Sequence, residues 1–232
     1  APASARCGGG LNMRAKPVVA IFDFDYTLAD SSAGVIDCVQ SAQVTMELPV
    51  ADPEAIRRTI GLSVPDTLAV LCGEEQRPRA EQFAQLFRAR ADEVMVGHTR
   101  IYDGVPEMFA QLRSEQIKCA IATTKFRYRI EEILARDGLT DLVHCIVGAE
   151  DVQAHKPDPG CLLQVLESLR CSANQAIYIG DSAPDAGAAQ RAGIDFVLVE
   201  TGLADLGTLD GFPRIAQLDD VTQLPAWLAN TE

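Results

Sequence analysis

Short apolar runs alternate with longer amphipathic segments along most of this chain after Met13. The apolar runs predict strands at 17–23, 118–122, 144–147, 176–179 and 195–198. The amphipathic segments predict helices at 104–115, 127–137, 158–169 and 183–192. Because strands that alternate with helices favour a parallel sheet covered on both faces, we expect an α/β fold with a doubly wound parallel sheet.

One interval interrupts this alternation. Residues 31–97 contain no convincing strand and are typical of several short helices separated by breaks. A stretch of this length is too long for a simple connection between neighbouring strands. We therefore predict an inserted small helical cap domain over 31–97 and a core domain formed by 17–30 and 98–232. Residues 1–16 are expected to be a disordered lead-in, since they show no periodic pattern.

Composition and charge narrow the class of protein. The 232 residues, 47% of them hydrophobic, are enough for one large core with a small satellite domain. No apolar stretch approaches the roughly 20 residues that span a bilayer, and the amino-terminal segment lacks the long apolar run of a secretory signal. We therefore expect a cytoplasmic protein. The net charge of -13 argues against a nucleic-acid or anionic-membrane surface, because both need clustered cations.

Seven cysteines are spread along the chain without a CxxC pair. Their number is odd, and their spacing matches no common zinc motif. The sequence therefore suggests neither a disulfide framework nor a structural zinc site.

Two carboxylates follow the first predicted strand two residues apart, in the run Asp23-Phe-Asp25-Tyr-Thr27. On an extended backbone, residues i and i+2 project to the same face, so Asp23 and Asp25 would converge at the carboxyl end of the strand. Open α/β sheets carry their ligand crevices at that edge. Two anions this close repel unless a cation or a proton separates them. The alternative is a solvated strand end with Thr27 capping the next helix, and this pattern alone does not decide between the two.

Three further polar clusters follow later strands. The run Thr123-Thr124-Lys125 places a hydroxyl and backbone amides beside the second core strand, and Lys156 lies in a turn stiffened by prolines. A later strand runs through Gly180 into Asp181 and Asp185. Each cluster alone is explained by an ordinary strand–helix junction, a solvated loop charge or a helix amino terminus. Together with the first pair of acids, in this order and at one edge of the sheet, they favour a shared site.

With these four clusters the chain resembles the haloacid dehalogenase-like hydrolase superfamily, with its Rossmann-like core. It is similar in particular to the phosphoglycolate phosphatase-like branch, which carries a helical C1-type cap between the first and second clusters. The resemblance covers residues 17 to about 200. It implies a Mg2+-dependent phosphatase that hydrolyses a small phosphorylated metabolite, a phosphoglycolate-like or sugar-phosphate monoester, through an aspartyl-phosphate intermediate. The expected partner is that metabolite, with no nucleic acid and no membrane, and the protein is expected to be a monomer or homodimer.

The resemblance also implies a role for each cluster. Asp23 would be the nucleophile and Asp25 the general acid and base. Mg2+ would be held by Asp23, by the backbone carbonyl of Asp25 and by Asp181, with Asp185 supporting the metal site. These roles suit phosphoryl transfer, which needs an oxygen nucleophile, neutralisation of the phosphate charge and hard oxygen ligands for Mg2+. The residues expected to bind the phosphate are Thr123, Thr124 and Lys156.

Three features near the expected site are particular to this chain. The run 59–63 resembles the cap loop by which phosphoglycolate phosphatase-like enzymes choose their substrate. The adjacent Arg57 and Arg58 are candidates for binding a substrate carboxylate, although they fit a solvated helix face equally well. Tyr26 stands where most members of the family have glycine, so that turn is expected to be bulkier, with Tyr26 as packing, gate or substrate contact.

Other activities of the superfamily fit less well. Asp25 argues against dehalogenase chemistry, and the absence of lysine from 31–97 excludes a Schiff base in the cap. Apolar Val35 and Val64 stand where a β-phosphoglucomutase would have histidine and arginine. Two alternatives stay open. One is an inorganic pyrophosphatase, which suits the Lys156 loop and the cap length, and the other is a catalytically silent binding module with the same fold.

Overall fold

The structure is a computed structural model that describes residues 17–202 and 206–230. The predicted lead-in over residues 1–16 lies outside these ranges. Contacts divide the chain into two compact units. Within the described ranges, the core unit comprises residues 17–28, 101–202 and 206–230, and the helical unit comprises Ala29–Arg100. The predicted insertion over 31–97 lies within the helical unit, and its action as a cap stays a prediction.

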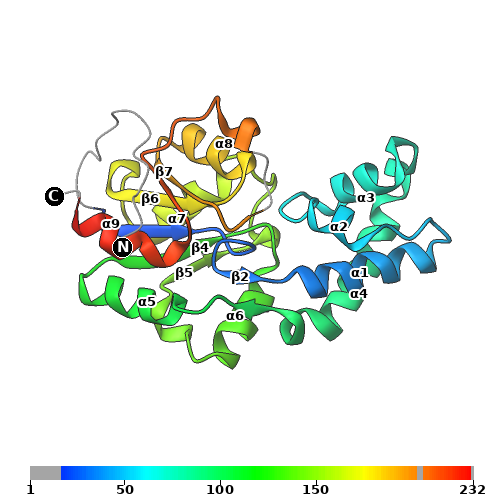
Figure 1. The fold of residues 1–232 in the computed structure, drawn as a ribbon, viewed down its shortest axis with the longest axis horizontal. Coiled ribbons are helices and arrows are strands. Elements are labelled where there is room, and N and C mark those ends of the chain that lie inside the picture. The colour runs from blue at the N-terminus through cyan, green and yellow to red at the C-terminus, as the bar shows by residue number, and fades with distance from the viewer. Residues whose placement is uncertain (1–16, 203–205, 231–232) are drawn as a thin grey trace. The chain divides into compact units, whose positions relative to one another are not determined.

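The core unit is built on a six-stranded parallel sheet (Figure 1). The strand order is β5-β4-β1-β6-β7-β8, which places β1 inside the sheet between β4 and β6. The sequence prediction of an α/β fold with a doubly wound parallel sheet is therefore confirmed. The strands are β1 (Val19–Phe22), β4 (Lys118–Ala122), β5 (Cys145–Val147), β6 (Ala176–Gly180), β7 (Asp195–Val199) and β8 (Ala216–Leu218).

Helices cover both faces of this sheet, as Figure 1 shows. Because successive side chains of a strand point to opposite faces, Ile21 joins the apolar cluster under α7 and α8, which contains Leu162. Phe22 faces the other way and meets Phe109 of α5 edge-on, with ring centroids 5.5 Å apart. The helices are α5 (Val105–Ser114), α6 (Arg127–Arg136), α7 (Gly160–Leu169), α8 (Ala183–Ala192) and α9 (Leu224–Ala229).

The register of the central strands brings the polar clusters to one edge of the sheet. Phe22 of β1 pairs with Ile121 of β4 on one side and with Ile179 of β6 on the other. The three strands therefore end at nearly the same level, and the backbone N–H of Asp23 still donates to the Ile179 carbonyl at 2.8 Å. The residues that emerge just beyond this carboxyl edge are Asp23, Thr123 and Asp181.

The helical unit contains the helices α1 (Ser32–Thr45), α2 (Pro53–Arg57), α3 (Val64–Cys72) and α4 (Ala80–His98). Its short strands β2 (Ala29–Asp30) and β3 (Arg100–Ile101) pair where the chain enters and leaves the unit. Two helices begin at capped positions, because the side chains of Asp52 and Ser63 accept hydrogen bonds from backbone N–H groups and a proline follows. The buried core of the unit includes Val39, Leu68 and Phe83.

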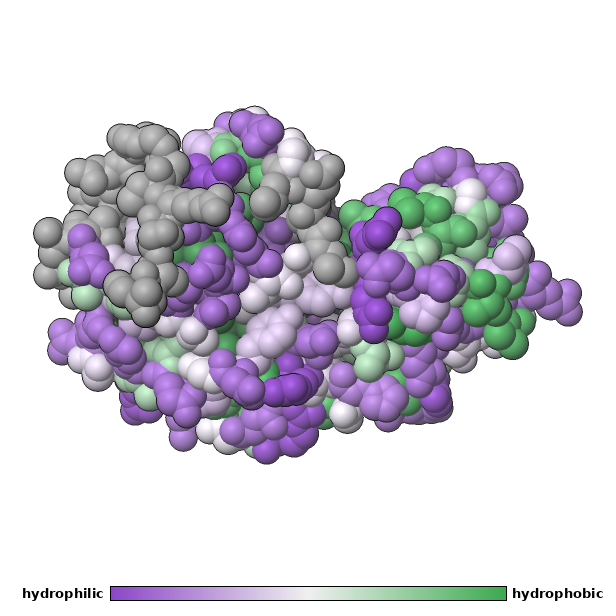
Figure 2. Space-filling model, viewed as in Figure 1, coloured by the Kyte–Doolittle hydropathy of each residue, from purple (hydrophilic) through white to green (hydrophobic). Residues whose placement is uncertain are grey.

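Exposed apolar side chains, the hydropathy of the helices and the state of the cysteines bear on function. Figure 2 shows hydrophobic residues on the visible face of the helical unit, and Val44, Val50 and Val70 are among its exposed large apolar side chains. Within the described ranges, no helix combines the length and the apolar character needed to cross a membrane. The six cysteines of those ranges are free thiols, and Cys7 lies outside them.

Candidate active site

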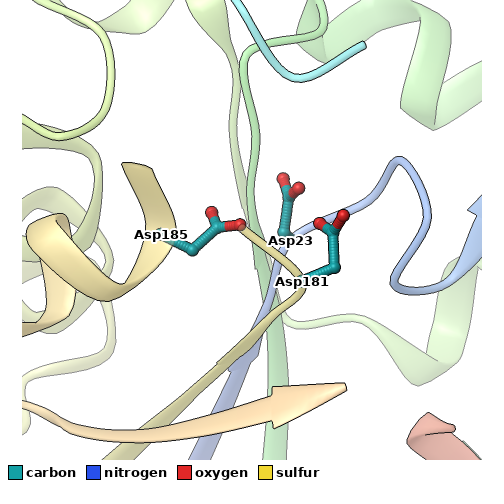
Figure 3. Close-up of side chains that lie close together, drawn as sticks. All are labelled: Asp23, Asp181 and Asp185. Atoms are coloured by element: carbon teal, nitrogen blue, oxygen red, sulfur yellow. The ribbon is translucent and has the colours of Figure 1, made fainter. Parts of the chain in front are cut away.

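Three buried carboxylates converge at the carboxyl edge of the core sheet (Figure 3). Asp23 follows β1, Asp181 follows β6, and Asp185 lies in the first turn of α8. One carboxylate oxygen from each residue lies within 4.8 Å of the other two, and their residues are at most 8% exposed. The structure thus brings together three of the acids that were expected to serve a metal ion. Buried carboxylate oxygens of this kind fit a hard divalent cation such as Mg2+.

The local sequence explains why Asp185 turns back toward the other two acids. Ser182 caps α8, and its backbone N–H donates to Asp185 Oδ2 at 3.1 Å while its hydroxyl bonds to the same oxygen. Both bonds run from Ser182 to the carboxylate of Asp185, and the two residues form a capping box at the start of α8. Gly180 leaves the space that this fold requires, because a Cβ atom there would lie 2.7 Å from the Asp185 Cβ. The absence of a side chain at Gly180 therefore makes room for Asp185 in the site.

Lys156 provides the positive charge of the cluster. Its Nζ lies 2.7 Å from Asp23 Oδ1 and 2.6 Å from Asp185 Oδ1. The same ammonium donates to the Tyr178 hydroxyl at 3.0 Å, and the lysine side chain is only 4% exposed. Two of these contacts, to Asp185 and Tyr178, are hydrogen bonds, and the contact with Asp23 is an ion pair. The loop that carries Lys156 is held by Arg191, whose Nη1 donates to the Pro157 carbonyl at 2.8 Å.

Tyr178 is a member of the site that sequence reasoning missed. This residue of β6 is fully buried, and its hydroxyl lies 2.7 Å from Asp185 Oδ1. In the sequence it reads as one more large residue of an apolar strand. The available signal was its polar tip two residues before Gly180, which places it on the same face of the strand as the close approach of Asp185. Tyr178 thus accepts a hydrogen bond from Lys156 and donates one to Asp185.

Burial dominates the electrostatics of the three acids. It raises the pKa of Asp23 from 3.8 to about 7, with Lys156 opposing the increase and Asp185 adding to it. Burial and the charge of Asp185 also raise the pKa of Asp181 well above its ordinary value. Burial alone would raise the pKa of Asp185, but Lys156, Ser182 and Tyr178 stabilise its carboxylate and lower it instead. The charge of Lys156 thus offsets only part of the effect of burial on Asp23 and Asp181, and a divalent cation would supply further positive charge.

Asp25 pairs with a second lysine, Lys125. The distance from Lys125 Nζ to Asp25 Oδ2 is 3.2 Å, and both side chains are almost fully buried, at 6% and 11% exposed. Sequence reasoning noted Lys125 only as part of the turn after the second core strand and gave it no role. The signal was a basic residue two positions beyond Thr123, in a turn predicted to reach the same edge. The side chain of Asp25 thus pairs with the ammonium of Lys125, whereas Asp23 pairs with that of Lys156.

Tyr26 adopts a backbone conformation that favours glycine, with φ of 60°. Its residue is only 8% exposed, and its carbonyl accepts a hydrogen bond from the hydroxyl of Thr201 in the loop after β7. Tyr26 therefore adopts the left-handed backbone conformation that a glycine would adopt without strain. For a tyrosine this conformation has a steric cost. The burial of Tyr26 agrees with the packing role among the three that were considered.

The remaining predicted residues fall in two places. Thr123 is buried, and its Oγ1 accepts a hydrogen bond from the Lys125 backbone N–H at 3.2 Å, with half-buried Thr124 between them. Arg57 and Arg58 belong to the helical unit, at the carboxyl end of α2. Each lies near Glu54 of its own helix, at 3.4 and 3.8 Å, with side chains 41% and 72% exposed.

Comparison with known proteins identifies relatives over most of the chain. Residues 20–199 match the sequence model of the haloacid dehalogenase-like hydrolases. A phosphoglycolate phosphatase of Rhodospirillum rubrum is 28% identical over 90% of this chain and 92% of its own length. Another from Pectobacterium atrosepticum is 30% identical over 74% of this chain and 75% of its own length. A solved structure from Bacteroides fragilis, described as haloacid dehalogenase-like, shares 33% identity at a TM-score of 0.86, covering 90% of this chain and all of that one.

Proposed function

The chain belongs to the haloacid dehalogenase-like hydrolase family, and from this membership we propose that it is a Mg2+-dependent phosphatase of small phosphorylated metabolites. The preferred substrates are phosphoglycolate-like or sugar-phosphate monoesters, in keeping with the names of its relatives. One observation carries the proposal. The Asp23 carboxylate lies at the carboxyl edge of the sheet, 2.7 Å from the Lys156 ammonium and within 4.8 Å of a carboxylate oxygen of Asp181. An anionic nucleophile and a place for a cation are thus adjacent, as phosphoryl transfer requires.

In the first step, a carboxylate oxygen of Asp23 attacks the phosphorus atom of the substrate. A bond forms between that oxygen and phosphorus, and the bond from phosphorus to the leaving oxygen breaks. Asp25 gives a proton to the leaving oxygen, which departs as an alcohol. Lys156, which already lies against Asp23, neutralises part of the phosphate charge, and the hydroxyl of Thr123 and the turn at Thr124 bind the phosphate oxygens.

In the second step, the aspartyl-phosphate on Asp23 is hydrolysed. Asp25, now a carboxylate, takes a proton from a water molecule whose oxygen attacks the phosphorus atom. The bond between phosphorus and the Asp23 oxygen breaks, which releases inorganic phosphate and restores the Asp23 carboxylate. Asp25 then carries the proton that the next substrate needs, so protons balance over the cycle.

The residues proposed to hold Mg2+ are Asp23, Asp181 and the backbone carbonyl of Asp25. Once bound, the ion supplies positive charge that allows an anionic nucleophile to approach an anionic phosphate. Both oxygens of Asp185 already accept hydrogen bonds or pair with Lys156, which supports a role for Asp185 in orienting the lysine and backing the metal site. In this proposal Asp23 and Asp181 bind the ion through their side chains, and Asp185 supports them.

Substrate choice is proposed to lie in the helical unit. Arg57 and Arg58 are proposed to bind a carboxylate or second anionic group of the substrate, and 59–63 to form the loop beside them. The net charge of -13 supports a small-molecule partner over nucleic acid or an anionic membrane. A cytoplasmic location and a monomeric or homodimeric state remain part of the proposal.

Steady-state kinetics of the purified protein test this function. We expect turnover of p-nitrophenyl phosphate and of 2-phosphoglycolate with Mg2+, loss of both in EDTA, and loss of both in Asp23→Asn. Asp195→Asn is the matched control, because Asp195 begins β7 at the opposite edge of the sheet. Full activity in EDTA or in Asp23→Asn would contradict the proposal. Faster turnover of pyrophosphate than of any monoester would identify a pyrophosphatase, and no turnover at all would favour the silent binding module.

A further inference from the structure

Each of the two acids that follow β1 has its own lysine. Asp23 Oδ1 lies 2.7 Å from Lys156 Nζ, and Asp25 Oδ2 lies 3.2 Å from Lys125 Nζ. The two lysines come from different loops, one after β5 and one after β4. The repulsion expected between the paired carboxylates is thus offset by two separate ammonium groups within the protein.

The turn that carries Lys125 is held in place through its backbone. The Lys125 N–H donates to Thr123 Oγ1 at 3.2 Å, and the Lys125 carbonyl accepts from the N–H of Ala149 at 3.0 Å. The loop after β5 also packs closely on the start of α6, since a Cβ atom at Gly148 would lie 2.9 Å from the Arg127 Cα. A lysine side chain normally loses much conformational freedom when it is fixed. Here the two backbone hydrogen bonds fix the position of the Lys125 Cα atom, and burial restricts the conformation of its side chain.

A buried ammonium is costly unless it is paired, so the position of Lys125 depends on its acidic partner. The reverse also holds, because the Asp25 carboxylate is itself only 11% exposed and lies 3.2 Å from the Lys125 ammonium. We propose that Lys125 is a positioning residue that holds the Asp25 carboxylate in the orientation used for proton transfer to the leaving oxygen. This inference rests on the proposed function, in which Asp25 is the general acid.

The proposal predicts a dependence on the leaving group. Departure of an alkyl oxygen needs a proton, because an alkoxide is a strong base, whereas p-nitrophenolate is a weak base that departs without one. Loss of Asp25 orientation should therefore affect alkyl phosphates far more than p-nitrophenyl phosphate. A lysine that bound the phosphate group itself would affect both esters alike, since both carry the same phosphate.

The experiment compares kcat/KM for glycerol phosphate and p-nitrophenyl phosphate in wild type, Lys125→Met and Lys125→Arg. We expect Lys125→Met to lower kcat/KM about tenfold or more for the alkyl ester and by less than about threefold for the aryl ester. Lys125→Arg, which keeps the charge, should recover part of the loss. Lys118→Met is the control, because Lys118 is exposed at the start of β4 and its replacement changes net charge equally.

Each other outcome has a defined meaning. Equal losses for both esters, with weaker inhibition by inorganic phosphate, would make Lys125 a phosphate ligand and overturn the proposal, as would unchanged kinetics. If Lys125→Met does not fold, Lys125→Gln is used in the same comparison. If the wild-type protein hydrolyses neither ester, the proposed function fails, and a crystal structure of Lys125→Met decides the present inference. A displaced Asp25 carboxylate would support positioning, and an unmoved one would overturn it.

Discussion

At the scale of single residues, the site depends on how one ammonium is shared. Lys156 Nζ has Asp23, Asp185 and Tyr178 within 3.0 Å, and its side chain is nearly buried. Burial and the charge of Asp185 raise the pKa of the Tyr178 hydroxyl, which therefore keeps its proton and donates it in a hydrogen bond to Asp185. Burial favours the neutral lysine, but the charges of Asp185 and Asp23 outweigh it and raise the Lys156 pKa. A permanently charged Lys156 is what a phosphate-binding role requires.

Removal of the Tyr178 hydroxyl tests this network. Tyr178→Phe takes a donor from Asp185 and an acceptor from Lys156, both buried. We expect the free energy of unfolding to fall by about 1–3 kcal/mol, and kcat/KM to fall several-fold because Lys156 is less well held. Urea denaturation and steady-state kinetics measure the two effects. Tyr128→Phe is the control, since Tyr128 is 38% exposed on α6. Equal stability of Tyr178→Phe and the wild type would contradict the importance of this hydroxyl.

The raised pKa of Asp23 predicts a pH dependence of stability. Between 3.8, its ordinary value, and about 7, the folded protein binds this proton more tightly than the unfolded chain does. Stability of the metal-free protein should therefore decrease as pH rises through that window, and the raised pKa of Asp181 acts in the same direction. Urea denaturation in EDTA at a series of pH values measures the slope. In Asp23→Asn the slope should be smaller, and an unchanged slope would show that Asp23 does not cause it.

At the scale of secondary structure, close approach between loops shapes the site. The loop after β7 touches two parts of it. Thr201 donates its hydroxyl to the carbonyl of Tyr26, and Gly202 lies against Asp181. A Cβ atom at Gly202 would lie 2.7 Å from the Asp181 Cγ and 2.8 Å from its Cβ, so a larger residue must displace the acid or the loop. Elements that contribute no predicted catalytic group therefore still position those that do.

Gly202→Ala should weaken metal binding through this contact. The added methyl group displaces the Asp181 carboxylate, and we expect at least about tenfold weaker Mg2+ binding. Isothermal titration calorimetry with Mg2+ or Mn2+ measures the affinity directly, without reference to turnover. Gly211→Ala is the matched control, because a Cβ atom there meets nothing within 4 Å. Equal metal affinity in both variants would show that the loop after β7 does not position Asp181.

At the scale of the whole molecule, the chain separates into a core unit and a helical unit. The core unit contains the acids and lysines of the candidate active site. The core unit carries every residue assigned to the chemistry of phosphoryl transfer. The helical unit has its own apolar core and its own capped helices, so changes on its surface should leave the core unit folded. This division predicts that catalysis and substrate choice respond to different substitutions.

Variants of the arginines on α2 test that division. Arg57→Ala and Arg58→Ala, alone and together, should raise KM for 2-phosphoglycolate severalfold, because an anionic group of the substrate loses a partner. Kinetics with p-nitrophenyl phosphate should stay near the wild-type values, since that ester has no carboxylate. Arg88→Ala, on the exposed face of α4, controls for the loss of a positive charge from the same unit. Equal KM changes for both substrates would argue against selective recognition of the carboxylate.

The periodic pattern of residues was enough to predict the parallel sheet and the order of its polar clusters. Strand period and helix period are local properties, and a parallel register then carries the ends of β1, β4 and β6 to one edge. Asp23, Thr123 and Asp181 could be placed in this way, because each directly follows a strand.

Tertiary packing alone decided which groups pair. Lys156 meets Tyr178 and Asp185 across 22 and 29 residues of sequence, and Lys125 meets Asp25 from the neighbouring strand's loop. Nothing local distinguishes these lysines from solvated loop charges, because a charge is buried only when the fold has already supplied its partner. The contact of Gly202 with Asp181 likewise forms only in the folded chain and leaves no local signal in the sequence. Periodicity encodes where a strand ends, whereas side-chain pairing depends on distances that exist only after the chain has folded.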